Sequence, residues 1–396
     1  MLTTNKNDFW FLGLVATVFL AFTVILSSLK PLWFDEFFTY HLAQLRPAEL
    51  FESLGPMDPH PPLNKLIVSV SQSLFGLTTF ATRLPSILFF IGTLITVYFI
   101  CKRLGGVFSA RLSSLLLLVS FAQQYAYEAR PYSLVIMLTA FLVYFWLKTP
   151  SEKLWNYACI SITTMALLSS HFYAVFIPGI LLLSSFIEWL RTKKIDKNLW
   201  LSIAIGYLIL IAYLPTIQKI RILDNVNWAH PSLHGLIQTI RNLYIPFAIA
   251  LTPALLNIKE WKQGVKTHAK LDPQFAIGLT LLAALALVGY PLSFLLGAYH
   301  VRYFIGSLIP CVIISAVIMS NFSKKQLNIS IALVAILFCY KLIHQTETHL
   351  HKKNEIDNII ALFDKRERGY PVFISNPFWF FILLKEASDA TKKEIQ

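Results

Sequence analysis

Long apolar runs without charged residues recur along almost the whole of this 396-residue chain. About twenty such residues are enough for a helix to cross the hydrocarbon core of a membrane, where the backbone has no water to bond. We expect spans of this kind, several of them short, at 9–29, 84–100, 107–122, 133–147, 154–170, 172–190, 199–215, 240–258, 275–295, 304–320 and 327–343. The sequence therefore predicts an all-α polytopic membrane protein with about eleven transmembrane helices.

The composition excludes other classes of protein. Apolar residues make up 56% of the chain and charged residues only 14%, which is incompatible with a water-soluble globular domain. The first run is too long for a signal peptide and has no small-residue cleavage site, so we expect a retained helix. The net charge of +13 is not gathered on a basic face with interleaved aromatics, and we expect no nucleic-acid partner. The four cysteines fall in or beside apolar runs without metal-ligand spacing, as is typical of small core residues.

The basic residues between the runs predict the orientation in the membrane. They fall on one side of the scheme, which the positive-inside rule makes cytoplasmic. The opposite, outer side then receives most of the acids and the otherwise unexplained polar residues. These basic residues are Lys102, Arg103, Arg111, Lys148, Lys153, Arg191, Lys193, Lys194, Lys197, Lys259, Lys262, Lys266, Lys270, Lys324 and Lys325.

Two domains are expected. Residues 1–343 form a membrane domain whose first outer loop covers 30–83, and residues 344–396 form a small extracytoplasmic tail. Within the loop, the apolar segment 66–75 is too short to cross and is predicted to be an interfacial helix. The pattern of the tail favours a helix near 356–363, a strand at 371–375 and a further helix from 378, a small βα unit.

An acidic pair, Asp35 and Glu36, directly follows the first apolar run. A carboxylate at this depth is partly desolvated and lies close to lipid headgroups, which suits chemistry on a lipid-linked substrate. The alternative is that both acids cap the helix predicted for 37–45, since acidic residues stabilise a helix N-terminus.

Further polar residues stand out on the same face. Prolines surround Asp58 and His60 and fix an extended backbone ahead of Lys65, so this stretch is either a binding loop or a stiff turn. Arg130 precedes Pro131, which suits the first turn of a helix, so backbone N–H groups and the guanidinium could together hold a phosphate. The alternative there is a pairing of Glu128 with Arg130 or another loop charge.

Two more candidates are isolated in the sequence. His171 stands alone between two apolar runs, where a histidine is more often a packing residue than a ligand. Arg302 and Tyr303 open a late span, and the alternative for the arginine is that it reaches up to lipid headgroups.

In this order the motifs resemble the dolichyl-phosphate-mannose-protein mannosyltransferase family and its bacterial relatives, including aminoarabinose transferases that act on lipid A. The resemblance implies a GT-C fold in the bacterial inner membrane. It also implies inverting transfer of a sugar from a polyprenyl-phosphate donor to a lipid, glycan or protein acceptor at the extracytoplasmic face. The chain lacks the large luminal insertion of the eukaryotic branch. By this resemblance Asp35 is the catalytic carboxylate, Glu36 is its neighbour in catalysis, and the substrate-binding residues are Asp58, His60, Lys65, Glu128, Arg130, Tyr132, His171, Arg302 and Tyr303.

Chemistry agrees with this assignment. A base must take the proton of the acceptor hydroxyl, and cations must stabilise the leaving phosphate, for which Lys219 is a further candidate. Hard ligands for a divalent cation are present in Asp35, Glu36, Asp58 and His60. We expect no required cofactor, because arginines can neutralise a lipid phosphate, and leave a divalent cation open.

Two other functions compete with this one. A transporter or flippase would bind the same lipid-linked sugar without cleaving it, but such proteins favour midplane charges and internal repeats. An oligosaccharide polymerase or ligase would use a lipid-pyrophosphate donor instead.

Overall fold

A computed structural model describes residues 6–55, 58–149, 153–222, 229–256, 272–365, 374 and 376–393. All regular secondary structure in these ranges is helical. The described residues contain no strand, only an isolated β-bridge between Leu54 and Asp58. The predicted all-α class is confirmed. The strand expected at 371–375 lies outside the described residues apart from Ile374, so the tail is described by its helices alone.

Most of the predicted apolar runs coincide with a helix. Among the described residues, six helices are long and apolar enough to cross a membrane on their own, or seven if the bent pair α9 and α10 forms one span. Several other runs are helices of only 12 to 15 residues, so fewer than eleven reach full length unaided. The helices of the membrane region are α1 (Lys6–Leu29), α5 (Thr79–Val119), α6 (Tyr132–Trp146), α7 (Leu154–Leu168), α8 (Phe176–Thr192), α9 (Lys197–Tyr207), α10 (Ile209–Ile222), α11 (Leu233–Thr239), α12 (Ile245–Leu256), α14 (Pro273–Leu296), α15 (Leu308–Met319) and α16 (Lys324–Lys365).

Helix α5 contains two of the predicted spans in one element. Its helical backbone breaks at Gly106, where φ is 79°, a conformation that glycine adopts without a steric cost. Arg83, near the start of α5, and Ala129, just beyond its end, both contact Glu36, whereas Lys102 near the break bonds Asp8 at the far end of α1. The two halves therefore form a hairpin, and the start of α5 and the segment that follows its end both lie beside Glu36.

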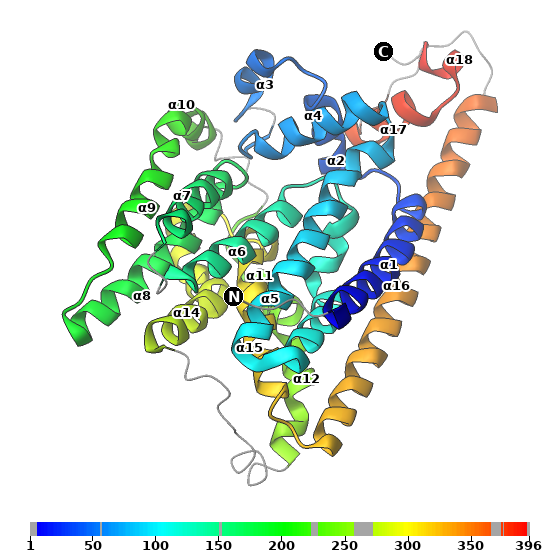
Figure 1. The fold of residues 1–396 in the computed structure, drawn as a ribbon. Coiled ribbons are helices and arrows are strands. Elements are labelled where there is room, and N and C mark those ends of the chain that lie inside the picture. Colours follow the sequence, from blue (N-terminus) through cyan, green and yellow to red (C-terminus); the bar gives the residue numbers. More distant parts are fainter. Residues whose placement is uncertain are drawn as a thin grey trace.

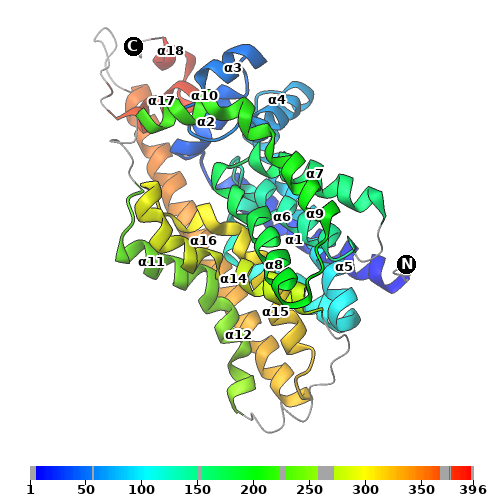
Figure 2. The ribbon, with the colours of Figure 1, turned by 90° about the vertical axis from the view of Figure 1, so that its left-hand side faces the viewer.

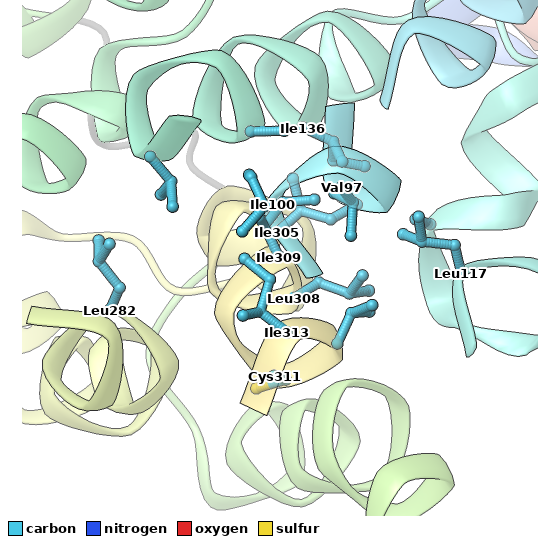
Figure 3. Close-up of a cluster of buried hydrophobic side chains, with 14 of the residues drawn as sticks. Val97, Ile100, Leu117, Ile136, Leu282, Ile305, Leu308, Ile309, Cys311 and Ile313 are labelled. Atoms are coloured by element: carbon cyan, nitrogen blue, oxygen red, sulfur yellow. The ribbon is translucent and has the colours of Figure 1, made fainter. Parts of the chain in front are cut away.

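The core lies where α5, α6 and α15 pack together. Figure 3 shows Val97, Ile100, Ile136, Ile305 and Ile309 meeting there, all of them buried. Burial of apolar side chains contributes roughly 25 cal/mol per Å² in water, but within lipid close packing must hold helices together instead. Gly278 of α14 illustrates this, because an added Cβ would come within 2.3 Å of the Trp146 ring on α6.

Shorter helices gather at one end of the molecule in both ribbon views (Figures 1 and 2). They are α2 (Phe34–Leu42), α3 (Pro47–Ser53), α4 (Leu63–Phe75), α17 (Pro377–Glu386) and α18 (Asp389–Lys392). Helix α4 is the short helix predicted for 66–75. Helix α16 runs without interruption past position 343, along one side of the molecule, and ends near the tail helices (Figure 1).

Short 3-10 and π-helices precede several of the α-helices. The 3-10 helices η1 (Phe121–Tyr127), η3 (Phe172–Val175) and η6 (Val301–Ser307) lead toward or into α6, α8 and α15, while the π-helix η5 (Ile240–Tyr244) leads into α12. The cysteine prediction holds for three residues but is wrong for Cys339, which is exposed on α16 because its helix presents that face outward.

Candidate active site

Asp35 lies in the first turn of α2, shortly after the C-terminal end of α1. One of its carboxylate oxygens is 3.0 Å from Nη1 of Arg302 and 3.8 Å from Nη2 of Arg130. Arg130 also donates a hydrogen bond of 3.0 Å to the backbone carbonyl of Asp35. Three motifs far apart in the sequence therefore meet at one carboxylate, which remains 21% exposed.

Aromatic rings fix the orientation of Arg302. Its guanidinium lies 5.5 Å from the centre of the Trp33 ring and 5.6 Å from that of Tyr132. Cation–π contacts of this kind attract the guanidinium to the ring faces and restrict its rotamers. Helix α6 begins at Tyr132 with Pro131 as its N-cap residue, one position before the first turn predicted for this proline, and Arg130 precedes the helix as predicted.

Asp58, His60 and Lys65 form a buried charged cluster beside Arg130. The Asp58 carboxylate pairs with His60, with Lys65 at 3.2 Å and with Arg130 at 3.4 Å. Lys65 also donates to the carbonyl of His60 at 3.0 Å. Burial alone would raise the pKa of Asp58, but Lys65, His60 and Arg130 outweigh it and hold this pKa well below its usual value. Asp58 is therefore ionised and supports Arg130 from behind.

His171 lies against this cluster in an aromatic environment. The centre of its ring is 5.0 Å from that of His60 and 5.4 Å from that of Tyr303. Its Nδ1 accepts a hydrogen bond from the backbone N–H of Tyr173, whereas its Nε2 is buried without a hydrogen-bond partner among the described residues. Burial and the neighbouring cations lower the pKa of His171 well below its usual value, so the ring is neutral at pH 7.

Glu36 belongs to a different set of contacts. Its side chain is fully buried and receives hydrogen bonds from Arg83 at 2.7 and 2.8 Å and from the N–H of Ala129 at 2.8 Å. Arg83 also donates to the carbonyls of Ser27, Lys30 and Pro31 at the end of α1. Although burial acts in the opposite direction, Arg83 lowers the pKa of Glu36. This pair ties together α1, α2, α5 and the loop before α6.

Glu128 lies on the same side as Glu36. It pairs with Lys30, not with Arg130, and the Lys30 ammonium stands over the rings of Trp33 and Tyr127. Burial raises the pKa of Glu128. The contact with Lys30 matches the alternative of a loop charge pair. Lys219 is exposed on α10 next to Gly55, and no contact with the Asp35 cluster is found for it in the described part of the chain.

Sequence reasoning missed three residues of this region. They are Lys30, Trp33 and Arg83, which lie within the predicted first outer loop, 30–83, without a role expected from the sequence. A signal for Arg83 existed, because it opens a span on the outer side just as Arg130 and Arg302 do. Its partner Glu36 lies 47 residues away, and nothing in the spacing indicates that pairing.

The proposed metal ligands are engaged with cations. The oxygens of Glu36 are held by Arg83 and Ala129, and those of Asp58 by Lys65, His60 and Arg130. Within the described ranges, no group of three or more His, Cys, Asp or Glu residues is arranged to hold a metal ion. A divalent cation does not fit this donor set as it stands.

Comparisons with known proteins agree with the motifs. Residues 59–217 match the family model of the dolichyl-phosphate-mannose-protein mannosyltransferases. This range contains His60, Lys65, Arg130 and His171 but not Asp35. A search of curated sequences finds no match.

The fold has solved counterparts. ArnT from Cupriavidus metallidurans in the apo state matches with a TM-score of 0.64 over 99% of this chain and 89% of that one, at 14% identity. The same protein bound to undecaprenyl phosphate gives 0.61 over 96% and 85%, also at 14% identity. The oligosaccharyltransferase AglB from Archaeoglobus fulgidus, in complex with an inhibitory peptide and a dolichol-phosphate, gives 0.60 at 12% identity over 92% of this chain but only 59% of its own. The chain therefore has the fold of these proteins, and the family model over residues 59–217 agrees with the resemblance that the motifs predicted.

Proposed function

We propose that this chain is a GT-C glycosyltransferase that takes a sugar from a polyprenyl-phosphate donor at the outer face of the bacterial inner membrane and transfers it with inversion to an acceptor hydroxyl. The observation that carries the proposal is the partly exposed Asp35 carboxylate held between Arg130 and Arg302. The likeness to ArnT bound to undecaprenyl phosphate and to AglB in complex with a dolichol-phosphate supports a donor of this class. Residues 1–343 would carry the reaction, with the tail, 344–396, on the outer side.

In the reaction, Asp35 acts as the general base. It accepts the proton of the acceptor hydroxyl while that oxygen forms a bond to the anomeric carbon. The bond between this carbon and the phosphate oxygen breaks, and its electron pair leaves with the phosphate. A positioned base of this kind contributes about a hundredfold to ten-thousandfold in rate.

The arginines stabilise the charge that develops on the phosphate. A guanidinium binds phosphate through two parallel N–H bonds, just as it binds a carboxylate. In the free enzyme Asp35 is the partner of both arginines; when the donor phosphate binds, it takes over these contacts and leaves Asp35 free to accept a proton. The buried pair of Asp58 and Lys65 keeps Arg130 in place throughout.

The test is cleavage of a polyprenyl-phosphate sugar by the protein reconstituted in vesicles. We expect the wild type to release polyprenyl phosphate and Asp35→Asn to lose about a hundredfold or more of the rate while folding normally, because the amide cannot accept the proton. Full activity of Asp35→Asn would exclude Asp35 as the base. A wild type that moves the donor across the membrane without cleaving it would be a flippase.

The outer position of the site can be tested separately by cysteine labelling. In a Cys339→Ser background, Glu52→Cys in α3 should react with an impermeant maleimide added to intact cells. Lys194→Cys, on the predicted cytoplasmic side, should react only after the membrane is disrupted. The reverse pattern would place the site on the inner face.

A further inference from the structure

His300 lies two residues before Arg302, the arginine that pairs with the Asp35 carboxylate at 3.0 Å. It is the N-cap residue of η6, and its Nδ1 accepts a hydrogen bond of 3.3 Å from the backbone N–H of Arg302. The centre of its ring is 5.9 Å from that of Tyr303. The histidine therefore belongs to the same turn as a cation of the candidate active site, although the proposed reaction does not use it.

The backbone that precedes His300 is held in place by two other segments. The hydroxyl of Tyr173 in η3 donates a hydrogen bond of 2.6 Å to the carbonyl of Ala298. The backbone N–H of Tyr299 donates one of 2.6 Å to the carbonyl of Ala229, which lies before α11. A side chain on a backbone fixed in this way keeps one position, as a group that orients a substrate must.

The hydrogen bond from Arg302 determines which nitrogen of His300 carries the proton. Burial and the Arg302 guanidinium lower the pKa of His300 to about 4, although the Asp35 carboxylate acts in the opposite direction, so the ring is neutral at pH 7. An Nδ1 that accepts a hydrogen bond has no proton, and a neutral imidazole then carries its proton on Nε2. Because Nε2 is at the end of the ring farthest from Cβ, His300 offers a neutral N–H donor directed away from the backbone that it caps.

His300 and Tyr303 form a small accessible face beside Arg302. Both side chains are partly exposed, whereas the other three residues of 300–304 are buried. An aromatic ring next to a neutral N–H donor suits a sugar, which has apolar C–H faces as well as hydroxyl groups. A phosphate, in contrast, is bound best by the positively charged arginines. The face is therefore suited to the uncharged part of the donor.

We propose that His300 is a substrate-binding residue that donates a hydrogen bond from Nε2 to a hydroxyl oxygen of the sugar on the polyprenyl-phosphate donor, while the ring of Tyr303 packs against that sugar. This inference rests on the proposed function, in which Arg130 and Arg302 bind the phosphate to which the sugar is attached. A site built to bond one hydroxyl group rejects a sugar that lacks it. His300 thereby selects the transferred sugar and holds its anomeric carbon close to Asp35.

The test measures binding and does not depend on turnover. The full-length protein in lipid nanodiscs is loaded with radiolabelled undecaprenyl phosphate, which is then displaced by unlabelled undecaprenyl phosphate, either bare or carrying mannose, glucose or arabinose. We expect the wild type to bind one of the sugar-bearing lipids more tightly than the bare lipid phosphate. In His300→Asn this preference should fall about threefold to tenfold, the range expected for one hydrogen bond to an uncharged group. The affinity for the bare lipid phosphate should stay unchanged.

Two substitutions separate the contact with the sugar from the N-cap. Asparagine is a good N-cap residue whose side-chain oxygen can replace Nδ1, so His300→Asn keeps the hydrogen bond from Arg302 but has no group in place of Nε2. The longer side chain of His300→Gln brings an amide N–H near the position of Nε2 but gives up the cap. We expect His300→Asn to keep the unfolding midpoint and lose the preference, and His300→Gln to lower the midpoint and keep part of the preference. His351→Asn, at an exposed position of α16, should match the wild type in both.

Three results would overturn this role of His300. An unchanged preference in His300→Asn would leave the histidine as a cap alone. Equal weakening of the bare and the sugar-bearing lipid would place its contact on the phosphate. A wild type that binds no sugar-bearing lipid better than the bare one would have no sugar site at this turn. If the wild type binds a sugar-bearing lipid but never cleaves it, the proposed function fails, while the preference still decides the role of His300.

Discussion

Asp35 and Glu36 are neighbours in the first turn of one helix, yet their surroundings have little in common. Asp35 remains partly exposed, and its carboxylate pairs with the side chains of Arg302 and Arg130. Glu36 is fully buried, and its oxygens are saturated by Arg83 and the N–H of Ala129. Successive residues of a helix point about 100° apart, so one acid faces the site and the other faces the protein.

The comparison separates a carboxylate that can exchange its partners from one that cannot. A group that must accept a proton needs contacts that a substrate can displace. A group that joins four chain segments needs contacts that nothing displaces. We therefore assign Glu36 to positioning Asp35, and we expect variants of the two groups to differ in whether they lose stability or activity.

The largest effect is expected for removal of one side of the buried pair. Glu36→Gln leaves Arg83 charged in a site with no compensating carboxylate, and breaking a buried ion pair in this way costs about 3–5 kcal/mol. The midpoint of thermal unfolding in detergent should fall accordingly, whereas Asp35→Asn should leave it within a few degrees of the wild type. Equal unfolding midpoints for the two variants would contradict the distinction.

A smaller effect, on activity and not on stability, is expected for Arg302, which pairs with Asp35. Arg302→Lys keeps the charge but loses the planar fork that can bind a phosphate through two bonds. We expect roughly a tenfold lower kcat for donor cleavage, about 1.4 kcal/mol, with little change in stability. Arg191→Lys on the exposed face of α8 is the matched control and should cleave the donor at the wild-type rate. A large loss of stability in Arg302→Lys would assign this arginine to the framework instead.

The buried histidines predict a pH dependence of stability. The pKa values of His60 and His171 are lowered in the folded state, so the unfolded chain binds more protons below about pH 6.5. Stability should therefore fall as the pH drops from 7 toward 5, with up to about 1.4 kcal/mol per pH unit from each histidine. His171→Gln should flatten the slope of the unfolding midpoint against pH. An unchanged slope would show that His171 does not contribute.

The smallest effect serves as a baseline. Arg46 and Glu49 form an exposed pair on α3, with the Arg46 side chain 83% exposed. Such pairs contribute about 0–1 kcal/mol. Arg46→Ala should leave both activity and the unfolding midpoint nearly unchanged; a shift as large as that of Glu36→Gln would mean that α3 has an unsuspected role.

Sequence alone predicted much of this arrangement. The apolar runs identified the helices because a bilayer permits few alternatives for an uncharged run. The ordered motifs brought Asp35, Arg130 and Arg302 to one face, which the structure joins at a single carboxylate. The pairing of Glu36 with Arg83 and of Glu128 with Lys30 could not be predicted, because contacts between distant segments depend on how helices pack. For the same reason the roles of Asp35 and Glu36 could not be separated.

Helix α16 has a mechanical consequence. Its 42 residues form a rod about 63 Å long, roughly twice the thickness of the hydrocarbon core. The helix is uninterrupted, and residues of its C-terminal half line a cavity together with Ile382 and Glu386 of α17. A change of about 5° in its tilt would displace the C-terminal end by roughly 5 Å relative to the N-terminal end. Because bilayer thickness influences the tilt of a long helix, a change of membrane would move this end of α16 more than any shorter helix of the bundle.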